Sequence, residues 1–311
     1  MARTDTVGPT AADSRDSTLD HDVLVVGGGA AGLSAATFLA RYGLDTLVLA
    51  RGKSAIQQCA SLENFLGFPV GITPDRFLAL GRTQVEHEGG TVRGETVERV
   101  ERIGLEEIPT GAGGQKPDIG GFRVLSDEHD YRVRYVLAAT AYDGEMFEPF
   151  IDEVETDEAF GMVDSEGGRT TVAGLYVAGW MTTETVHQAV VNAGHGAQAA
   201  ISLIRDDIAA RYWPAVADHY VDWAVHEGRY AGDEEWDDHT REWFEDEVLV
   251  DGVETDLAES ALEHLKSEFL DRQIDADERK RRDRMGQRAL LGQMDDDVVN
   301  EYAAGLNTTD D

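Results

Sequence analysis

The stretch HDVLVVGGGAAGLSAATFLARYGLDTLVLA, which runs from His21 to Ala50, decides the fold. Its apolar residues 23–26 suit a strand that is buried on both faces, and residues 46–49 suit a second, parallel strand. Between them, residues 30–42 have the apolar density of a helix that ends at a glycine. This segment therefore predicts a strand–helix–strand unit with a glycine-rich turn before the helix.

The glycine-rich turn has the spacing of a dinucleotide-binding loop, because Gly27, Gly29 and Gly32 form a G-x-G-x-x-G pattern. Such glycines make a tight turn, admit a pyrophosphate close to the backbone and let helix and strand pack closely. The phosphates lie at the helix N-terminus, which begins here with Ala30 and Ala31. The alternative is a glycine-rich loop that serves packing alone. The strand before the loop and the helix after it favour a dinucleotide site.

The charge balance of the 311-residue chain is strongly acidic, with 61 acidic and 27 basic residues and a net charge of −34. Such a charge repels phosphates, so neither nucleic acid nor an anionic membrane is expected as a partner. Molar salt shortens the Debye length to about 3 Å and screens the self-repulsion. The composition is therefore typical of a cytoplasmic protein from an extreme halophile, with an acidic mesophilic protein as the alternative.

Cysteine and histidine usage argues against a metal centre. The single Cys59 excludes an internal disulfide and a cysteine-based zinc cluster. His219, His226 and His239 lack the spacing of metal ligands, so no metal is expected.

No apolar stretch approaches the roughly 20 residues of a membrane span. Residues 1–20 have no apolar signal region and are expected to form a disordered acidic tail, which favours a cytoplasmic location.

The remaining chain predicts an α/β domain followed by helices. The expected elements are a helix at 74–88, strands at 91–93 and 96–103, a β-hairpin at 122–125 and 131–138, a buried strand at 174–179 and a helix at 183–204. Residues 142–168 show no clear periodic element. Gly194 and Gly196 belong to a small-residue face of the 183–204 helix, which permits a close approach to a neighbour.

A polar and charged segment follows residue 205, and its period is helical. We expect helices at 207–228, 233–248, 256–273 and 276–293, anchored by Trp213, Trp223, Trp236 and Trp243. A basic cluster within 279–284 is interpreted as a solvated helix face. The expected organisation is thus a tail at 1–20, a nucleotide-binding domain at 21–205 and a helical extension at 206–311.

Four stretches in order, at 27–32, 62–69, 136–140 and 172–200, together resemble the flavin domain of the thioredoxin reductase family. The resemblance covers residues 21 to about 205. It implies a Rossmann-like FAD-binding domain, built from a parallel sheet plus a β-hairpin or meander, with FAD as the cofactor of an oxidoreductase. Besides the glycine loop, it places Asn64, Thr140, Gly179, Gln188 and Ala189 at the cofactor. Further expected cofactor contacts are Arg51, Gln58, Ala139, Trp180 and His187.

The chain departs from that family in several places. The family carries an inserted NADPH domain with a Cys-x-x-Cys pair, but the 140–172 interval has room for neither, and Cys59 is the one cysteine. The internal dithiol relay is therefore excluded. Three smaller departures fall on the flavin domain itself: Ala141 follows Ala139-Thr140, Trp180 follows Gly179, and Ala50-Arg51 ends the second strand without a carboxylate.

Two side chains are candidates for catalysis. Cys59 precedes the flavin-side segment by a few residues and is a candidate thiol nucleophile, with a small half-buried packing residue as the alternative. His187 is a candidate hydrogen-bond donor or proton relay beside the flavin, with a polar residue at a helix start as the alternative.

The function predicted from these observations is an FAD-dependent oxidoreductase. It would perform two-electron or hydride flavin chemistry with an external donor and an unidentified substrate. The alternative is a non-catalytic FAD- or NADP-binding module with an assembly role, since Arg51 and Lys53 are placed to meet a 2′-phosphate. A homodimer is compatible with the family resemblance and with the apolar anchors of the extension.

Overall fold

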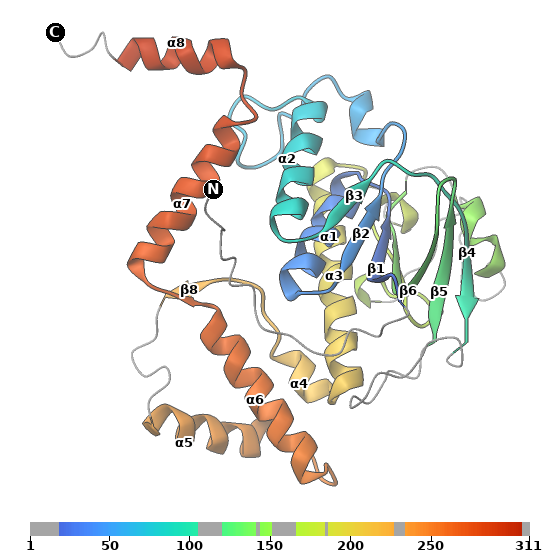
Figure 1. Cartoon of the computed structure of the whole chain (residues 1–311), viewed down its shortest axis with the longest axis vertical. Coiled ribbons are helices and arrows are strands. Elements are labelled where there is room, and N and C mark those ends of the chain that lie inside the picture. The colour runs from blue at the N-terminus through green and yellow to red at the C-terminus, as the bar shows by residue number, and fades with distance from the viewer. Residues whose placement is uncertain are drawn as a thin grey trace.

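The computed structural model describes residues 19–104, 120–140, 144–150, 166–183, 186–226 and 234–306. It is a mixed α/β structure with a Rossmann-like sheet and additional C-terminal helices, which confirms the predicted fold class (Figure 1). The strands of the main sheet are β1 (His21–Val26), β2 (Thr46–Leu49), β3 (Thr91–Arg93), β4 (Val97–Ile103), β5 (Gly121–Ser126), β6 (Asp130–Ala138) and β7 (Leu175–Val177). The helices packed on the sheet are α1 (Ala30–Tyr42), α2 (Pro74–His87) and α3 (Ala189–Arg211).

Among the described residues, the main sheet has seven strands in the order β3-β2-β1-β6-β5-β4, with β7 also paired to β6. Strands β3, β2, β1, β6 and β7 run parallel, whereas β4, β5 and β6 form an antiparallel meander. Strand β6 joins the two parts: residues 130–133 pair with β5 and residues 136–138 pair with β7. The predicted parallel sheet with an added hairpin is therefore confirmed.

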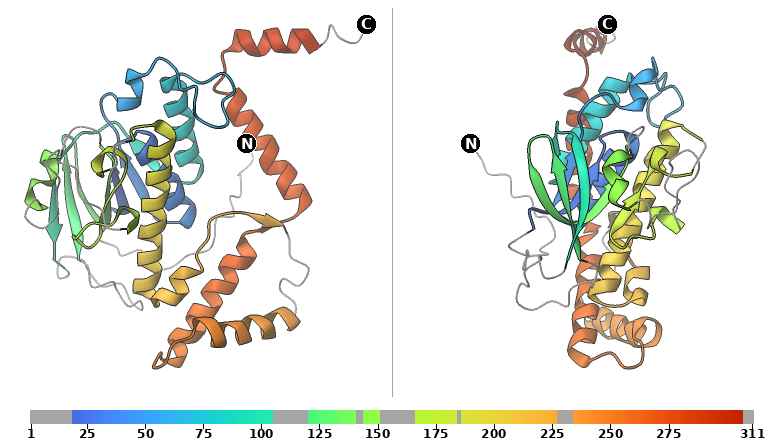
Figure 2. Two further views of the ribbon diagram at one scale, coloured as in Figure 1. Left: turned by 180° about the vertical axis from the view of Figure 1, so that it is seen from behind. Right: turned by 90° about the vertical axis from the view of Figure 1, so that its right-hand side faces the viewer.

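Alternate residues of the central strand enter opposite cores, because successive side chains of a strand point to opposite faces. Val23 and Val25 belong to the core beneath the helices, and Leu24 and Val26 belong to the core on the meander side. Figure 2 shows α3 lying across the helical face of the sheet. Burial on both faces explains why β1 and β2 are continuous apolar runs.

The meander-side core is completed by short helical turns that follow β6. Residues of η3 (Glu145–Phe150) bring Met146, Phe147 and Phe150 into this core, and Phe150 packs edge-to-face on Phe122 with ring centroids 5.9 Å apart. The turns η4 (Glu166–Gly168) and η5 (Gly179–Met181) lie on either side of β7. These elements fall partly in the region where the sequence shows no clear periodicity.

The C-terminal segment adds helices that extend the helical-side core. They are α4 (Pro214–Asp218), α5 (Glu234–Trp243), the π-helical turn η6 (Phe244–Val248), α6 (Thr255–Asp271), α7 (Ala276–Leu291) and α8 (Asp296–Leu306), with a short parallel pair of β8 (Val225–His226) and β9 (Gln273–Ile274). Side chains of α4, η6 and α6, such as Val216, Val248 and Leu262, share one core cluster with α1 and α3. The helix α3 runs continuously through residue 205, where the sequence analysis placed the domain boundary.

Two predicted helices are wrong in their extents. The 207–228 helix does not form, because α3 continues to Arg211 and Pro214 then starts the short helix α4 at its first turn. The helix predicted to begin at residue 183 begins at Ala189 instead. Gln188 has an extended backbone (φ −102°, ψ 143°), and β-branched threonine and valine residues precede it. The helix α8 and the β8–β9 pair were not predicted.

The predicted tryptophan anchors divide into buried and exposed residues. Trp213 is buried and its indole N–H donates to the carbonyl oxygen of Val248 over 2.8 Å, which ties α4 to η6. Trp236 and Trp243 are half-buried. Trp223 is 59% exposed, so the prediction that it anchors the extension is wrong. It lies in the irregular segment after α4, where no helix presents it to the core.

Two further expectations concern the ends and the membrane. Of the predicted tail, residues 1–18 lie outside the described part, and Asp20 already forms hydrogen bonds with the backbone of Arg132. Ala141 and most of residues 142–168 also lie outside the described ranges. Among the described residues, no helix combines the length and the apolar character needed to cross a membrane.

Candidate functional site

The glycine loop between β1 and α1 requires glycine for steric reasons. Gly27 has a φ of +111°, and a Cβ added there would lie 2.5 Å from the carbonyl oxygen of Ala139. A Cβ at Gly32 would lie 1.9 Å from the carbonyl oxygen of Gly27. Because the backbone of α1 approaches the turn this closely, neither position can take a side chain without movement. This is the geometry expected of a loop that holds a pyrophosphate against its backbone.

The N-terminus of α1 is open to an anion. Its N-cap residue is Gly29, which makes no side-chain capping hydrogen bond, and the first turn contains no acidic residue. The first N–H groups of a helix have no partner within the helix, and the helix dipole adds positive potential there. Ala30 and Ala31 are buried, so only backbone is presented at this end. The predicted phosphate-binding residues Gly27, Gly29, Ala30, Ala31 and Gly32 thus form one continuous cradle.

The ends of β6 and β7 lie beside this cradle, as expected at the carboxyl edge of a parallel sheet. Ala139 contacts Gly27, and the Thr140 hydroxyl donates to the sulfur of Met181 over 3.1 Å. Gly179 follows β7 with a φ of +64°, and a Cβ added there would lie 3.0 Å from the Cβ of Ala31. The structure therefore brings the glycine loop, the end of β6 and the end of β7 together.

Asn192, on the first turn of α3, belongs to the same place and was missed by the sequence analysis. Its Oδ1 atom is buried and has no hydrogen-bond partner among the described residues. This oxygen lies 3.7 Å from the Cβ position of Gly179, next to the glycine loop. A buried polar atom without a partner costs free energy, so this oxygen is a candidate acceptor for a hydrogen-bond donor of a bound molecule. Its helical setting makes Asn192 look in sequence like any polar helix residue.

A second contact joins the segment 62–72 to the start of α3. The side-chain amide of Asn64 donates to Oε1 of Gln188 over 2.8 Å, and both residues are exposed. Gln188 is the N-cap residue of α3, and the first turn of that helix, starting at Ala189, contains no acidic residue. Asn64, Gln188 and Ala189 were predicted to lie together from the resemblance alone, and the structure places them at one helix N-terminus.

Trp180 and His187 form a ring pair at the outer side of this helix start. Their ring centroids are 4.4 Å apart and their planes are tilted by 43°. Trp180 is half-buried and His187 is exposed. The ring pair joins η5 to the residue before the N-cap of α3, and that N-cap residue, Gln188, in turn contacts Asn64.

Three other predicted residues belong to the segment that follows β2. Arg51 forms an ion pair with Asp127, a residue of the β5–β6 turn, and is about half-exposed. Gln58 ends the 3₁₀ helix η1 (Ala55–Gln58), and Cys59 is exposed immediately after it. The structure shows no contact of Cys59 with the other described site residues. The thiol is open to solvent, which does not fit the alternative of a half-buried packing residue.

A separate polar cluster braces the β5–β6 turn. The buried carboxylate of Glu95 accepts hydrogen bonds from Ser126 (2.6 Å) and Tyr131 (2.8 Å), and it lies 3.1 Å from Nδ1 of His129. Desolvation raises the pKa of Glu95, but the hydrogen bonds from Ser126, Tyr131 and His129 outweigh it and lower the pKa below its ordinary value. With Glu128, these groups have the composition of a cation site. The oxygens of Glu95 are already used to hold the turn.

The fold and the site define a Rossmann-like FAD-binding domain, and comparisons with known proteins agree. Residues 22–101 match the family model described as FAD binding domain. The chain is 28% identical to a thioredoxin reductase of Streptomyces clavuligerus over 204 residues, which are 64% of this chain and 52% of that protein. It is 37% identical to a thioredoxin reductase of Treponema pallidum over 98 residues, or 30% of this chain and 32% of that protein.

One solved structure shows the same fold over most of the matched part of the chain. A thioredoxin reductase from Gloeobacter violaceus superposes with a TM-score of 0.53 at 18% identity, covering 66% of this chain and 99% of that one. The chain spans about half the length of the first curated relative that it matches. These similarities, with a cradle that a Cβ would fill and an unpartnered buried oxygen beside it, support FAD as the cofactor.

Proposed function

We propose that the protein is an FAD-dependent oxidoreductase related to the thioredoxin reductases, and that it exchanges electrons with an external donor. The observation that carries the proposal is the assembly of the glycine loop, the ends of β6 and β7 and the start of α3 at one edge of the sheet. A phosphate-binding loop alone would serve any dinucleotide. The additional contacts at Asn64, Gln188 and Asn192 favour a flavin, since a simple NADP domain has no need of them.

In this proposal each element has a separate role toward FAD. The backbone of residues 27–32 holds the pyrophosphate, and Asn192 accepts a hydrogen bond from the cofactor at Gly179. When bound, FAD supplies two-electron chemistry at its isoalloxazine ring. The N-terminus of α3, at Gln188 and Ala189, presents positive potential toward negative charge on the reduced ring. His187 is placed to donate a hydrogen bond to the flavin or to relay a proton, and the indole of Trp180 lies against the imidazole of His187.

The electron donor is proposed to come from outside this domain. The sequence contains one cysteine, Cys59, so an internal Cys-x-x-Cys relay is absent from these 311 residues. The short interval between β6 and β7 leaves no room for an inserted NADPH domain of the family type.

A reaction of the exposed Cys59 thiol with a substrate or with the flavin is part of the proposal. Arg51 is proposed to reach the nucleotide half of FAD when its ion pair with Asp127 opens, and Gln58 to lie nearby.

We also propose the setting in which the protein acts. The net charge of −34 supports a cytoplasm of high salt, where self-repulsion is screened. Residues 21–205 are proposed as the cofactor-binding unit and residues 206–311 as the helical extension. The α7–α8 part of that extension leaves apolar side chains uncovered, which supports a homodimer.

The experiment that tests catalysis is anaerobic mixing of the full-length, FAD-loaded protein with NADPH, and separately with NADH. Loss of the flavin absorbance, followed by steady turnover when an artificial acceptor is added, is the expected result. The Gly27→Ala variant serves as the control, because it retains the chain but not the cradle for the pyrophosphate. It should show neither bleaching nor turnover.

One result of this experiment would contradict the proposed catalysis. If dithionite bleaches the bound flavin while neither nicotinamide nucleotide nor a reduced carrier protein does so, the flavin is bound without an accessible donor. The non-catalytic FAD-binding module would then describe the protein better than an enzyme.

A further inference from the structure

The two C-terminal helices α7 and α8 form an arm that has almost no contact with the rest of the described chain. Neither helix contains a buried residue. The arm is tied to α2 through an ion pair between Arg76 and Asp295 and a weak hydrogen bond between Gln293 and Thr83. Helices of this length are marginal in water, and their stability in proteins comes mostly from a packed face. The arm therefore needs a partner surface.

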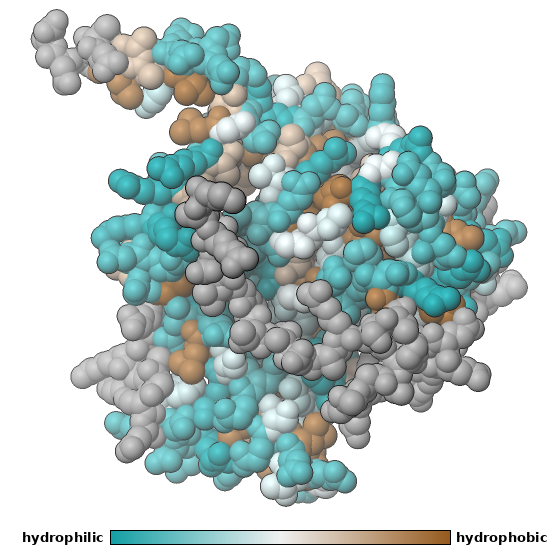
Figure 3. All heavy atoms as spheres, in the orientation of Figure 1, coloured by the Kyte–Doolittle hydropathy of each residue, from teal (hydrophilic) through white to brown (hydrophobic). Residues whose placement is uncertain are grey.

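The arm carries an apolar face that remains uncovered. Val298 is 56% exposed and Tyr302, one turn later in α8, is 71% exposed. Leu290 and Leu291 at the end of α7 are also exposed. Figure 3 shows apolar side chains along α8 and at its junction with α7, on a molecule whose visible surface is otherwise mainly hydrophilic. Exposed apolar side chains that gather on one helix mark an interaction surface.

The charge of α7 is opposite to that of the molecule. It contains six basic and three acidic residues, a net of +3, in a chain of net charge −34. Lys280, Arg281 and Arg282 pair with acidic residues of the same helix. Within the described part of the chain, Arg284 and Arg288 make no ion pair, although acidic residues outnumber basic ones by more than two to one.

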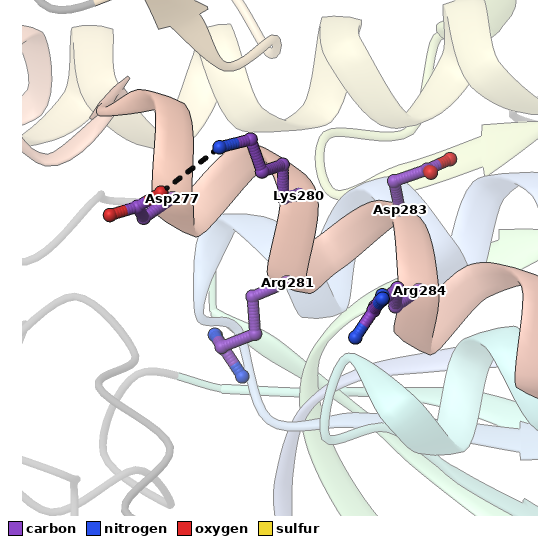
Figure 4. A pocket seen from close by; sticks show the side chains of 5 residues that line it. All are labelled: Asp277, Lys280, Arg281, Asp283 and Arg284. Atoms are coloured by element: carbon purple, nitrogen blue, oxygen red, sulfur yellow. Dashed lines mark hydrogen bonds and ion pairs between the residues drawn. The ribbon is translucent and has the colours of Figure 1, made fainter.

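The basic residues of α7 line a shallow, open hollow along the helix, and Figure 4 shows its lining side chains. Arg281 and Arg284 project from one side of the helix, whereas Lys280 and Asp283 project from the other. Arg288 follows Arg284 by one turn, so these two guanidinium groups share a face. This is an extended charged surface and not an enclosed pocket, which fits a macromolecular partner.

The complementary surface is present in the same chain, on α5 and η6. These elements contain eight acidic residues and one basic residue, a net of −7. Asp238 and Glu242 lie one turn apart, are exposed, and make no ion pair with another described residue. The helix α5 is held on α6 by an ion pair from Lys266 to Asp237 (2.7 Å). Beside it on α6, Phe269 is 45% exposed and offers apolar surface.

The two surfaces do not meet within one copy. Among the described residues, neither Arg284 and Arg288 of α7 nor Asp238 and Glu242 of α5 take part in an ion pair, so the two charged surfaces are not paired with each other. Figure 1 shows α7 leading away from the α5–α6 pair. A second copy of the chain can satisfy both surfaces at once, because a two-fold axis makes two equivalent contacts, each between α7 of one copy and α5 of the other. Nucleic acid and anionic membranes are disfavoured by the net charge of −34.

We infer that the α7–α8 arm of one copy docks on the α5–α6 hairpin of a second copy, and that the exchange of arms is reciprocal. Arg284 and Arg288 face the carboxylates of α5, and the apolar residues of the arm cover Phe269 and Leu270 of the partner. The inference specifies the homodimer included in the proposed function. It does not depend on whether FAD is bound.

The test uses two charge-reversal variants of the full chain in a common buffer at a salt concentration that keeps both folded. One carries Arg284→Glu with Arg288→Glu, and the other carries Asp238→Arg with Glu242→Arg. Sedimentation velocity over a concentration series is expected to show a dimer for the wild type. Each variant alone should dimerise at least about tenfold more weakly, since like charges then face each other in both contacts. Circular dichroism of each variant checks that the helices are retained.

Mixing the two variants provides the decisive measurement. In the mixed dimer, one contact joins the reversed α7 to the reversed α5 and the other joins the native α7 to the native α5. Opposite charges then face each other in both contacts, so the affinity should return toward that of the wild type. Arg99→Glu with Arg132→Glu, on exposed positions of the meander, is the matched control and should dimerise normally. A monomeric wild type, unaffected dimerisation in both variants, or a mixture that stays monomeric overturns the inference. Binding of the monomeric wild type to anionic vesicles would assign the arm to a membrane instead.

Sedimentation tests the dimer and visible absorbance tests the flavin, so the two proposals can fail separately. A dimer without visible absorbance leaves the arm exchange standing and counts against the proposed oxidoreductase. A yellow protein that sediments as a monomer at every concentration overturns the arm exchange and leaves the proposed flavoprotein standing.

Discussion

At Gly27 the backbone takes a conformation that side chains avoid, and it lies within reach of β6. A Cβ there would meet the carbonyl oxygen of Ala139 at 2.5 Å. Gly43, at the other end of α1, also has a positive φ of +96°, but an added Cβ would meet nothing within 4 Å. A side chain at Gly43 would therefore cost only backbone strain. A side chain at Gly27 would cost backbone strain and would also displace the loop from Ala139.

Replacing each glycine by alanine tests this difference. Gly43→Ala should cost about 1–2 kcal/mol in unfolding free energy through the left-handed backbone alone, with FAD affinity unchanged. Gly27→Ala should cost about 2–4 kcal/mol and weaken FAD binding at least tenfold, because the loop must move away from Ala139. Chemical denaturation and FAD titration measure the two quantities. Equal FAD affinity in both variants would contradict the role given to the loop.

His264 predicts a pH dependence of stability. Burial, with the charges of Arg211 and Arg272 nearby, lowers the pKa of His264 from 6.5 to about 4. The unfolded chain therefore binds a proton that the folded chain excludes between these pH values. The stabilising contribution is present above pH 6.5 and is lost as the pH falls toward 4, by at most about 3 kcal/mol.

The measurement compares wild type with His264→Phe, which keeps a ring for stacking on Tyr212. The unfolding free energy of the variant should fall less steeply between pH 6.5 and 4. Glu268 has a pKa raised by burial and acts in the opposite direction, and its carboxylate lies 3.7 Å from Nε2 of His264. Making the comparison in a Glu268→Gln background therefore isolates the histidine. Identical slopes would show that His264 is protonated in the fold.

At the scale of elements, the close crossing of α1 and α3 holds the two helix N-termini of the site in place. Gly196 of α3 makes this possible, because a Cβ there would lie 2.0 Å from the carbonyl oxygen of Ala31. Gly194, two residues earlier, faces open space. The small-residue face predicted from the sequence is thus confirmed for Gly196, and its neighbour is α1.

These two glycines of one helix give a matched pair of variants. Gly194→Ala should stabilise the protein by up to about 1 kcal/mol, since alanine favours a helix. Gly196→Ala should destabilise it by about 1–3 kcal/mol and weaken FAD binding, because α3 must shift away from the glycine loop. Thermal unfolding and FAD titration report both effects. A stabilised Gly196→Ala variant would mean that the helices do not cross as closely as described.

Local signals explain which elements could be predicted. The bounds of α1, β2 and β3 follow from short apolar runs and from glycine and proline boundaries, and they match the structure. The helix expected at 207–228 fails because its periodic pattern continues through Pro214, where the backbone restarts a short helix.

The site could be predicted only in part, for a related reason. The glycine loop is contiguous in sequence and carries its own steric signature. Asn192 becomes visible only when α3 is placed against Gly179, since its burial depends on tertiary packing. The ion pair of Arg51 with Asp127 likewise joins residues far apart in the chain, so the sequence shows Arg51 as a basic residue near a nucleotide and nothing more.

At the scale of the whole molecule, the net charge of −34 predicts a strong dependence of stability on salt. The Debye length falls from about 30 Å at 0.01 M salt to about 3 Å at 1 M, which screens most of the self-repulsion. The melting temperature should therefore rise steeply over this range of KCl concentration. Sucrose at matched osmolarity serves as the control, because it is uncharged. An equal rise in sucrose would assign the effect to solvent exclusion instead of screening.

The central claim, that the edge of the sheet is an FAD site, is tested most directly by the absorbance spectrum of the full-length protein purified in molar salt. The account predicts flavin bands in the visible range, with the cofactor released on denaturation identified as FAD. If the protein is colourless and also fails to take up added FAD, the cradle of residues 27–32 holds another ligand, and the account is contradicted.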